Sequence, residues 1–290
     1  MAYGTPSSTD KIKDYYTDIR AGLVPSEELI ANLVKRYNAI GGASPLYSIT
    51  AKQTTGLQRA LAARGSGARV YFGMKHSEPF ISEVVKKSAA EGVEELLCVA
   101  IAPHYSITGI GSYISRVKDA NSSLGNKIKA VFVESWHLNG NLLDFWSASI
   151  LKAAYGMPDP FIIFSAHSLP EKVEDAGPYK SQLLETAAAV AKSAGMENWG
   201  LAFQSQSSRG EKWYGPTITE LMESNLKDGR SFVVAPIGFV SDNLEILYDI
   251  DIACKGWCNG RGITMARAYM PNDSAMLISA LDDIARRNGF

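Results

Sequence analysis

Short apolar runs alternate with amphipathic, helix-length segments along most of this chain. The apolar runs, rich in Val, Ile, Leu, Phe and Ala, occupy 70–74, 96–102, 130–133, 161–165, 199–203 and 231–235. Segments with helical spacing follow most of them, at 78–91, 139–155, 179–194 and 216–228. Buried strands that alternate with helices are typical of βαβ units and a parallel sheet. The pattern therefore predicts an α/β fold.

The alternation runs through both halves of the chain with a faint internal symmetry. A strand ending in Ala-Pro occurs in each half, at Ala102-Pro103 and Ala235-Pro236. A chain of 290 residues also fits two domains of ordinary size. We predict two Rossmann-like lobes facing each other across a cleft, an N-terminal lobe of residues 1–138 and a C-terminal lobe of residues 139–273. The last helix, 274–287, is expected to pack back against the N-terminal lobe.

Composition and charge exclude several classes of partner. The hydrophobic content is 46%, the charged content is 20% and the net charge is −1, so no overall field attracts nucleic acid or an anionic membrane. The apolar runs are far shorter than the roughly 20 residues that span a bilayer, and the opening M-A-Y-G-T-P has no signal pattern. We expect a cytoplasmic protein without integral membrane contact. If Met1 and Ala2 end a first strand, that strand is unusually short, which favours a truncated start.

Three cysteines do not form a disulfide framework. Cys98 lies within an apolar run and is expected to be a core residue, whereas Cys254 and Cys258 form C-x3-C. Such a pair holds a metal only with two further ligands, which the sequence does not obviously supply. We therefore expect neither an iron-sulfur cluster nor another resident prosthetic group. The G-I-G-S-Y of 109–113 is weak evidence for a dinucleotide, because it lacks the third glycine of the fingerprint.

One histidine stands where a ligand site is expected. The run F-I-I-F-S-A-H-S-L-P, 161–170, is a buried strand that stops at His167. In open α/β sheets, ligands bind beyond the carboxyl ends of the strands, so a titratable group placed there is a functional candidate. The alternative is a histidine that is satisfied within the core or caps a helix.

A second candidate element lies at 238–252, G-F-V-S-D-N-L-E-I-L-Y-D-I-D-I. Asp242 followed by Glu245 matches a capping box, so a helix is expected to begin at Asp242. Asp242, Glu245 and Asp249 then share one helix face, although neighbouring like charges repel by about 0.2 to 0.5 kcal/mol per pair. Either the face is solvated or it forms a path for a cation or for protons that leads to Glu245.

These motifs together resemble the ferrochelatase family. The resemblance rests on F-S-A-H-S-L-P, A-F-Q-S, W-Y-G-P-T-I-T-E and P-I-G-F-V-S-D-N-L-E-I-L-Y-D-I-D, and in the first half on M-A-Y-G-T-P, Y-N-A-I-G-G-A-S-P-L, G-M-K-H-S-E-P-F and A-P-H-Y-S. It covers essentially the whole chain. Tyr3 in the opening turn is most similar to the monomeric coproporphyrin type of Gram-positive bacteria. The implied reaction is insertion of Fe2+ into a porphyrin, most simply coproporphyrin III, and the implied state is a monomer.

The resemblance also implies roles for particular residues. His167 and Glu245 would bind the incoming metal or accept protons on one face of the porphyrin, and Tyr3 would lie on the other face as an iron ligand. Contacts to the porphyrin propionates would come from Arg20, Arg36, Tyr37, Ser44 and Tyr113, with Lys75 and Trp213 as weaker candidates. His76, His104 and His137 are expected to be structural, with His104 also able to line the cleft.

Two departures from the family pattern bear on function. Asn243 stands where the family commonly has a histidine, and Ala253 stands where an outer metal site would have an acid. A second histidine role is lost, and the outer site is put in doubt. Three alternatives to the expected activity stay open: a ferrochelatase acting on protoporphyrin IX, a haem or metalloporphyrin carrier of the same fold, and a related chelatase that uses cobalt and an earlier tetrapyrrole.

Overall fold

A four-stranded parallel sheet forms the centre of the C-terminal lobe. In the computed structural model, which describes residues 1–175, 177–206 and 210–290, its strand order is β4-β3-β5-β6. The strands are β3 (Pro160–His167), β4 (Trp199–Gln204), β5 (Ser231–Ala235) and β6 (Met265–Arg267). The run Ile162 to Phe164 is fully buried because both faces of β3 are covered by helices.

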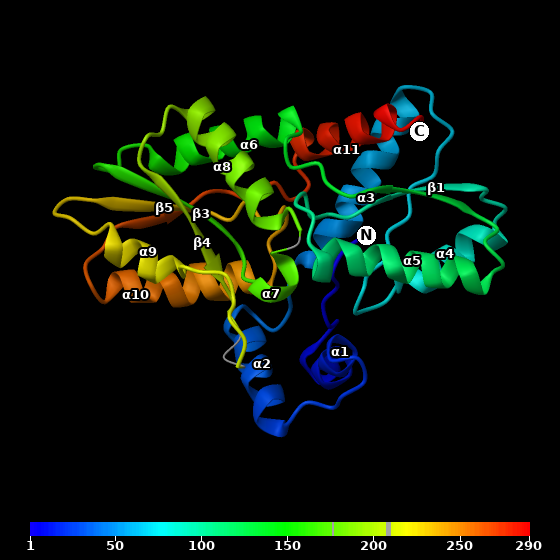
Figure 1. The fold of residues 1–290 in the computed structure, drawn as a ribbon, viewed down its shortest axis with the longest axis horizontal. Helices are drawn as coiled ribbons and strands as arrows, with labels where there is room; N and C mark the ends of the chain where they lie inside the picture. Colours follow the sequence, from blue (N-terminus) through cyan, green and yellow to red (C-terminus); the bar gives the residue numbers. More distant parts are fainter. Residues whose placement is uncertain (176, 207–209) are drawn as a thin grey trace.

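Helices cover both faces of this sheet (Figure 1). On one side α6 (Gly140–Ala154) packs against α8 (Tyr179–Ala194), and on the other lie α9 (Ile218–Ser224) and α10 (Lys255–Asn259). The π-helix η3 (Ile246–Cys254) runs directly into α10, and the short α7 (Glu171–Glu174) follows β3. This layering is what the alternating apolar and amphipathic segments predict.

The N-terminal lobe has a smaller sheet, in which β1 (Glu95–Val99) pairs in parallel with β2 (Lys129–Val133). Two helices that pack on each other, α4 (Ile81–Ala90) and α5 (Ser112–Ser123), belong to this lobe, and the π-helix η2 (Ile107–Gly111) leads into α5. Four helices lie between the opening residues of the chain and Met74. They are η1 (Thr9–Lys11), α1 (Ile12–Ile19), α2 (Glu27–Ala39) and α3 (Leu46–Ala63).

The strand predicted at 70–74 is wrong except at its last residue. Met74 forms single parallel bridges with Ala2 and with Phe80, and no named strand includes it. The other side of the opening segment meets β1, where the Met1 ammonium donates to the Val99 carbonyl at 2.7 Å. Residues 70–72 have no strand partner in the described parts of the chain. On this side, the opening segment pairs only with the residues around Met74.

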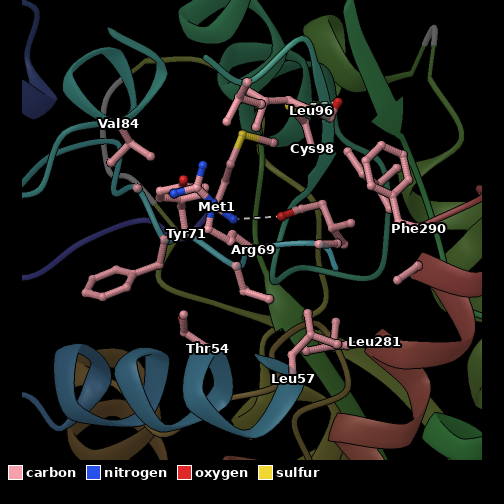
Figure 2. Close-up of a pocket in the computed structure, with 18 of the residues that line it drawn as sticks. Met1, Thr54, Leu57, Arg69, Tyr71, Val84, Leu96, Cys98, Leu281 and Phe290 are labelled. Carbon is pink, nitrogen blue, oxygen red and sulfur yellow. Dashed lines mark hydrogen bonds between the residues drawn. The ribbon is translucent and has the colours of Figure 1, made fainter. Parts of the chain in front are cut away.

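A cavity of about 400 Å³ lies beside this opening segment. Figure 2 shows Met1 at its centre, with Leu57 on the α3 side, Leu96 on the β1 side and Phe290 at the edge. Burial lowers the pKa of the Met1 ammonium to about 6, against a smaller opposite effect from Cys98. Both ends of the chain therefore line the same cavity.

The last helix, α11 (Ala275–Arg287), packs against α3 and against α6, and so touches elements of both halves of the chain. The predicted fold class, two α/β lobes with parallel sheets flanked by helices, is confirmed. A membrane-spanning helix is absent from residues 1–175, 177–206 and 210–290, where each helix is too short or too polar for that role.

Candidate metal and proton site

The imidazole of His167 meets the carboxylate of Glu245 at the carboxyl end of β3. His167 Nε2 lies 3.3 Å from Glu245 Oε1, and the two side chains are 34% and 29% exposed. The other ring nitrogen, Nδ1, is hydrogen bonded to the Ser168 carbonyl, which accepts and therefore holds a proton on Nδ1. Nε2 is thus the nitrogen that faces Glu245 and the open side of the site.

The two groups form an ion pair whose proton is held tightly. Burial favours the neutral imidazole, but the charge of Glu245, its hydrogen bond and the Ser168 carbonyl outweigh burial and raise the pKa of His167 to about 9. Burial also opposes ionisation of Glu245, yet His167 and then Arg36 hold the pKa of this carboxyl below its ordinary value. At neutral pH the resting pair is therefore an imidazolium and a carboxylate.

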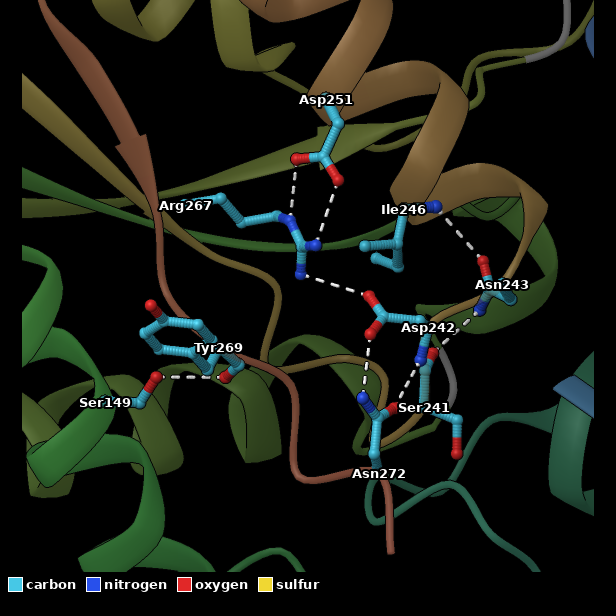
Figure 3. Close-up of polar contacts among 9 residues, drawn as sticks. All are labelled: Ser149, Ser241, Asp242, Asn243, Ile246, Asp251, Arg267, Tyr269 and Asn272. Carbon is cyan, nitrogen blue, oxygen red and sulfur yellow. Dashed lines mark hydrogen bonds and ion pairs between the residues drawn. The ribbon is translucent and has the colours of Figure 1, made fainter. Parts of the chain in front are cut away.

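The helix that carries Glu245 begins one residue later than predicted. Asn243 is its cap, because the Asn243 side-chain oxygen accepts from the backbone N–H of Ile246 at 3.1 Å (Figure 3). The prediction that Asp242 caps the helix is wrong, since its carboxylate accepts instead from Asn272 at 2.7 Å and forms an ion pair with Arg267 at 3.1 Å. The asparagine that replaces the family's histidine thus has a structural task.

The same network fixes the direction of the helix. Figure 3 shows Arg267 on β6 between two carboxylates, bidentate to Asp251 at 2.7 and 2.9 Å and also paired with Asp242. A planar guanidinium that binds two carboxylates holds both in one geometry. Arg267 on β6 therefore fixes the position of η3, the helix that follows Glu245.

Asp249, one turn beyond Glu245, is also paired. Its carboxylate accepts from Arg36 at 2.5 Å and from Ser205 at 2.5 Å. Burial raises the pKa of Asp249, and Arg36 opposes that effect. The predicted column of three carboxylates is therefore held by arginine and histidine partners. Arg36, predicted to bind a propionate, is engaged here with Asp249 and stacks over the Tyr248 ring at 4.9 Å.

Of the three tyrosines predicted to contact the porphyrin, Tyr37 and Tyr113 are buried. Burial raises the pKa values of Tyr3, Tyr37 and Tyr113, and the charge of Glu245 raises each of them further. Tyr3 is the most open of them at 42% exposure, and it remains a neutral phenol well above neutral pH.

Lys75 was predicted only as a weaker propionate candidate, yet it contacts more of the predicted site residues than Arg20 or Ser44 does. Its ammonium lies 5.8 Å from the ring centre of Tyr3 and 5.6 Å from that of Tyr113. Burial first, and then repulsion from Arg116, lower the pKa of Lys75 to about 8. A cation between two tyrosines of the site suits an anionic edge of a ligand.

Arg20 and Ser44 are positioned less directly. Arg20 donates from Nε to the Leu23 carbonyl at 3.3 Å, at the exposed end of α1. The Ser44 hydroxyl is buried and accepts from the Leu46 backbone at the start of α3. Within the described parts of the chain, neither makes a hydrogen bond to His167 or Glu245. Trp213 has a buried indole N–H without a partner among the described residues.

The other three histidines have structural partners. His76 binds Asp18 at 2.6 Å, His104 binds Thr186 at 2.9 Å and His137 binds Glu185 at 2.9 Å. Burial lowers the pKa of His104 to about 3, and its ring is only 2% exposed, so it does not line an open cleft. Among the four histidines, His167 is the one whose ring nitrogen faces an open site.

A metal bound by the pair would keep open coordination positions. The described residues contain no group of three or more His, Cys, Asp and Glu side chains that encloses a metal. Sites that pass a metal on or activate a ligand keep positions free of protein donors, whereas structural sites are closed. The His167–Glu245 pair therefore suits transient binding of a divalent ion.

Two α/β lobes with such a pair at a strand end have the architecture of metal chelatases. SirB from Bacillus subtilis with Fe3+ matches this structure with a TM-score of 0.59 at 9% identity, over 82% of this chain and 89% of that one. CbiX, described as the terminal enzyme of sirohaem biosynthesis in denitrifying bacteria, matches with a TM-score of 0.56 at 11% identity, over 84% and 93%. These likenesses establish the chelatase fold.

Sequence comparisons show to which family of chelatases the chain belongs. The ferrochelatase family model matches residues 1–289. Coproporphyrin III ferrochelatase of Listeria monocytogenes is 39% identical over 97% of this chain and 94% of the relative, and that of Anoxybacillus flavithermus is 40% identical over 97% and 92%. The chain belongs to the ferrochelatase family, and the family resemblance inferred from its motifs is confirmed.

Proposed function

We propose that this enzyme inserts Fe2+ into coproporphyrin III, giving coproheme and two protons. The relatives named above carry that substrate in their names. The observation that carries the proposal is the ion pair of His167 and Glu245, 3.3 Å apart and partly exposed at the end of β3. An imidazole and a carboxylate are suitable donors for a borderline divalent ion and can both accept protons.

The pair accounts for the proton balance of the reaction. In the resting state it holds one proton, on His167. Fe2+ displaces that proton when it binds, because a metal ligand must be deprotonated. As iron moves into the porphyrin, the freed imidazole takes one pyrrole proton and the Glu245 carboxylate takes the other, which it passes to water. The pair returns to imidazolium and carboxylate, and two protons have been released for each iron inserted.

The N-terminal lobe would hold the porphyrin itself. Lys75, with Tyr113 beside it, is placed to meet a propionate, and Tyr3 is the candidate iron ligand on the face opposite His167. Tyr37, Ser44 and Arg20 remain propionate candidates from the family resemblance. Arg36 can serve a propionate only if it leaves Asp249, so porphyrin binding would exchange one carboxylate partner for another.

An anaerobic absorbance assay tests the proposal. Wild-type protein, Fe2+ and either coproporphyrin III or protoporphyrin IX are mixed in parallel, and the same is done with Glu245→Gln and with Glu223→Gln, an exposed acid on α9. We expect rapid conversion of coproporphyrin by catalytic amounts of wild type and of Glu223→Gln, and loss of conversion in Glu245→Gln.

The alternatives give different results in the same assay. Preferential conversion of protoporphyrin would assign the other substrate, and binding without conversion would indicate a carrier. Asn243, which had kept the carrier in consideration, is occupied in capping the helix. We also propose that the enzyme acts as a cytoplasmic monomer without a resident prosthetic group. Light scattering and metal analysis of the purified protein test the monomer and the absent group.

A further inference from the structure

Four sulfur atoms meet inside the C-terminal lobe, away from the His167–Glu245 pair. Cys258 Sγ lies 3.6 Å from Met222 Sδ and 3.7 Å from Met265 Sδ, and Cys254 Sγ lies 3.7 Å from the same Met265 Sδ. The C-x3-C motif, for which the sequence suggested no further ligands, thus has two thioethers beside it.

The four residues come from four different elements. Cys254 ends η3, Cys258 lies in α10, Met222 lies in α9 and Met265 begins β6. Figure 1 shows α9 and α10 together on one side of the C-terminal sheet. The sequence separations, up to 43 positions, explain why no local motif shows this sulfur cluster.

The spacing of the sulfur cluster matches that of donors around one metal ion. Bonds from a d10 ion to thiolate sulfur are about 2.3 Å long. Sulfur atoms around one trigonal or tetrahedral ion then lie about 3.8 to 4.0 Å apart. The separations of 3.6 and 3.7 Å need to expand by only a few tenths of an ångström.

The donor types select the ion. Thiolate and thioether ligands together favour Cu(I), whereas protein zinc sites use thiolate, imidazole and carboxylate. Iron-sulfur clusters take four cysteine thiolates, or histidines in their place, and the described residues place only two cysteines here. Fe2+, the substrate of the family, finds its preferred nitrogen and oxygen donors at His167 and Glu245 instead.

Burial and charge are compatible with an enclosed ion. Met222 and Cys258 are fully buried and Cys254 is 5% exposed, while Met265 is partly exposed and offers a way in. Two thiolates and one monovalent cation carry a net charge of −1. Lys255 and Arg261, each three residues from Cys258 in the sequence, supply positive charge on the same segment.

We propose that Cys254, Cys258, Met222 and Met265 form a binding site for one Cu(I) ion per chain. Binding replaces the two thiol protons, which are released to water, and forms two copper–thiolate and up to two copper–thioether bonds without any redox step. An occupied site would join η3 and α10 to β6 and α9, and so would stabilise the helical segment that carries Glu245. The proposal does not depend on the porphyrin substrate.

Competition for buffered copper tests the site. The full-length, reduced protein is titrated anaerobically into a coloured Cu(I)–bicinchoninate complex, and loss of colour reports transfer of copper to the protein. We expect uptake of one Cu(I) per chain by wild type and by Cys98→Ser, which removes the cysteine outside the cluster. Cys254→Ser and Cys258→Ser should each lower the affinity at least about 100-fold, and Met222→Leu and Met265→Leu about tenfold.

X-ray absorption of the wild-type copper complex provides a readout that needs no folded variant. Copper surrounded only by sulfur at about 2.3 Å supports the proposal. No uptake from the buffered complex, nitrogen or oxygen in the first shell, or equal uptake by the Cys254→Ser/Cys258→Ser double variant would each overturn it. If the cysteine variants do not fold, the methionine variants decide. Unchanged copper affinity in both of them, together with nitrogen or oxygen among the atoms bound to copper, would also overturn the proposal.

Discussion

In the C-terminal lobe, β3 is hydrogen bonded on both sides and places His167 at the end of a fully buried strand. In the N-terminal lobe, the residue that reaches the same site is Tyr3, carried by a short segment that pairs around Met74 beside a cavity. The pair that we propose to handle metal and protons is therefore held on the more completely packed lobe, and the phenols and Lys75 lie on the less completely packed one. A site that must hold a small ion at fixed distance needs the more rigid support.

The largest effect is expected from a substitution that removes the imidazole of His167 and leaves the N-terminal lobe unchanged. His167→Ala should lower kcat for iron insertion by about 10² to 10⁴-fold, the range for loss of a proton-transferring group. Porphyrin affinity, which we assign mainly to the other lobe, should change little. Stopped-flow absorbance and fluorescence titration with coproporphyrin measure the two quantities. Turnover retained in His167→Ala would contradict the assigned role.

The difference in packing can be tested by matched truncations. Ile163→Ala, at a fully buried position of β3, should reduce the free energy of unfolding by about 2 to 5 kcal/mol. Leu96→Ala, in β1 and lining the cavity, should cost about 1 kcal/mol, because its side chain is partly exposed and already faces empty space. Urea unfolding curves give both values. Equal costs would show that the two sheets are equally well packed.

The proton on His167 makes metal binding depend on pH. Since the pKa of His167 is raised to about 9, a metal must displace a proton at neutral pH. The affinity for Co2+ without porphyrin should therefore rise about tenfold per pH unit from 7 and level off near 9. Calorimetry measures this slope. In Glu245→Gln the pKa of His167 should fall and the plateau should begin at lower pH, so an unchanged profile in that variant would contradict the ion pair.

The smallest effect is expected at the rim of the N-terminal lobe. Lys75→Met keeps the length of the side chain but removes its charge, so KM for coproporphyrin should rise about threefold to tenfold with kcat unchanged. Lys118→Met, on the same lobe but over Phe132, is the matched control and should leave both constants unaltered. A fall in kcat of Lys75→Met with KM unchanged would move Lys75 from porphyrin binding to chemistry.

The sequence was most informative where chemistry follows a continuous apolar run. The buried strand ending at His167 was predicted from hydrophobicity alone, since a parallel strand covered on both faces has no polar positions. Glu245 could be placed only on a helix, and its contact with His167 spans 78 positions that no local pattern connects. The family resemblance supplied that pairing before the structure did.

Other errors have local physical causes. Asp242 and Asn243 are both good caps, and the choice between them depended on Arg267 and Asn272, which come later in the chain and engage Asp242. Residues 70–74 have strand composition, but a strand also needs a partner, and only Met74 has one. Arg36 was predicted only as a propionate contact, because its partner Asp249 lies 213 positions away in the sequence.

The cavity that both Met1 and Phe290 line has a use in protein engineering. A linker between these two residues would replace the buried Met1 ammonium, which donates to Val99, by an amide, and the chain can be reopened elsewhere. The junction at Tyr155 and Gly156, after α6 and strongly exposed at Tyr155, is a suitable new opening. A circular permutant beginning at Gly156 would place β3 first in synthesis and would carry Tyr3 on an internal, tethered segment.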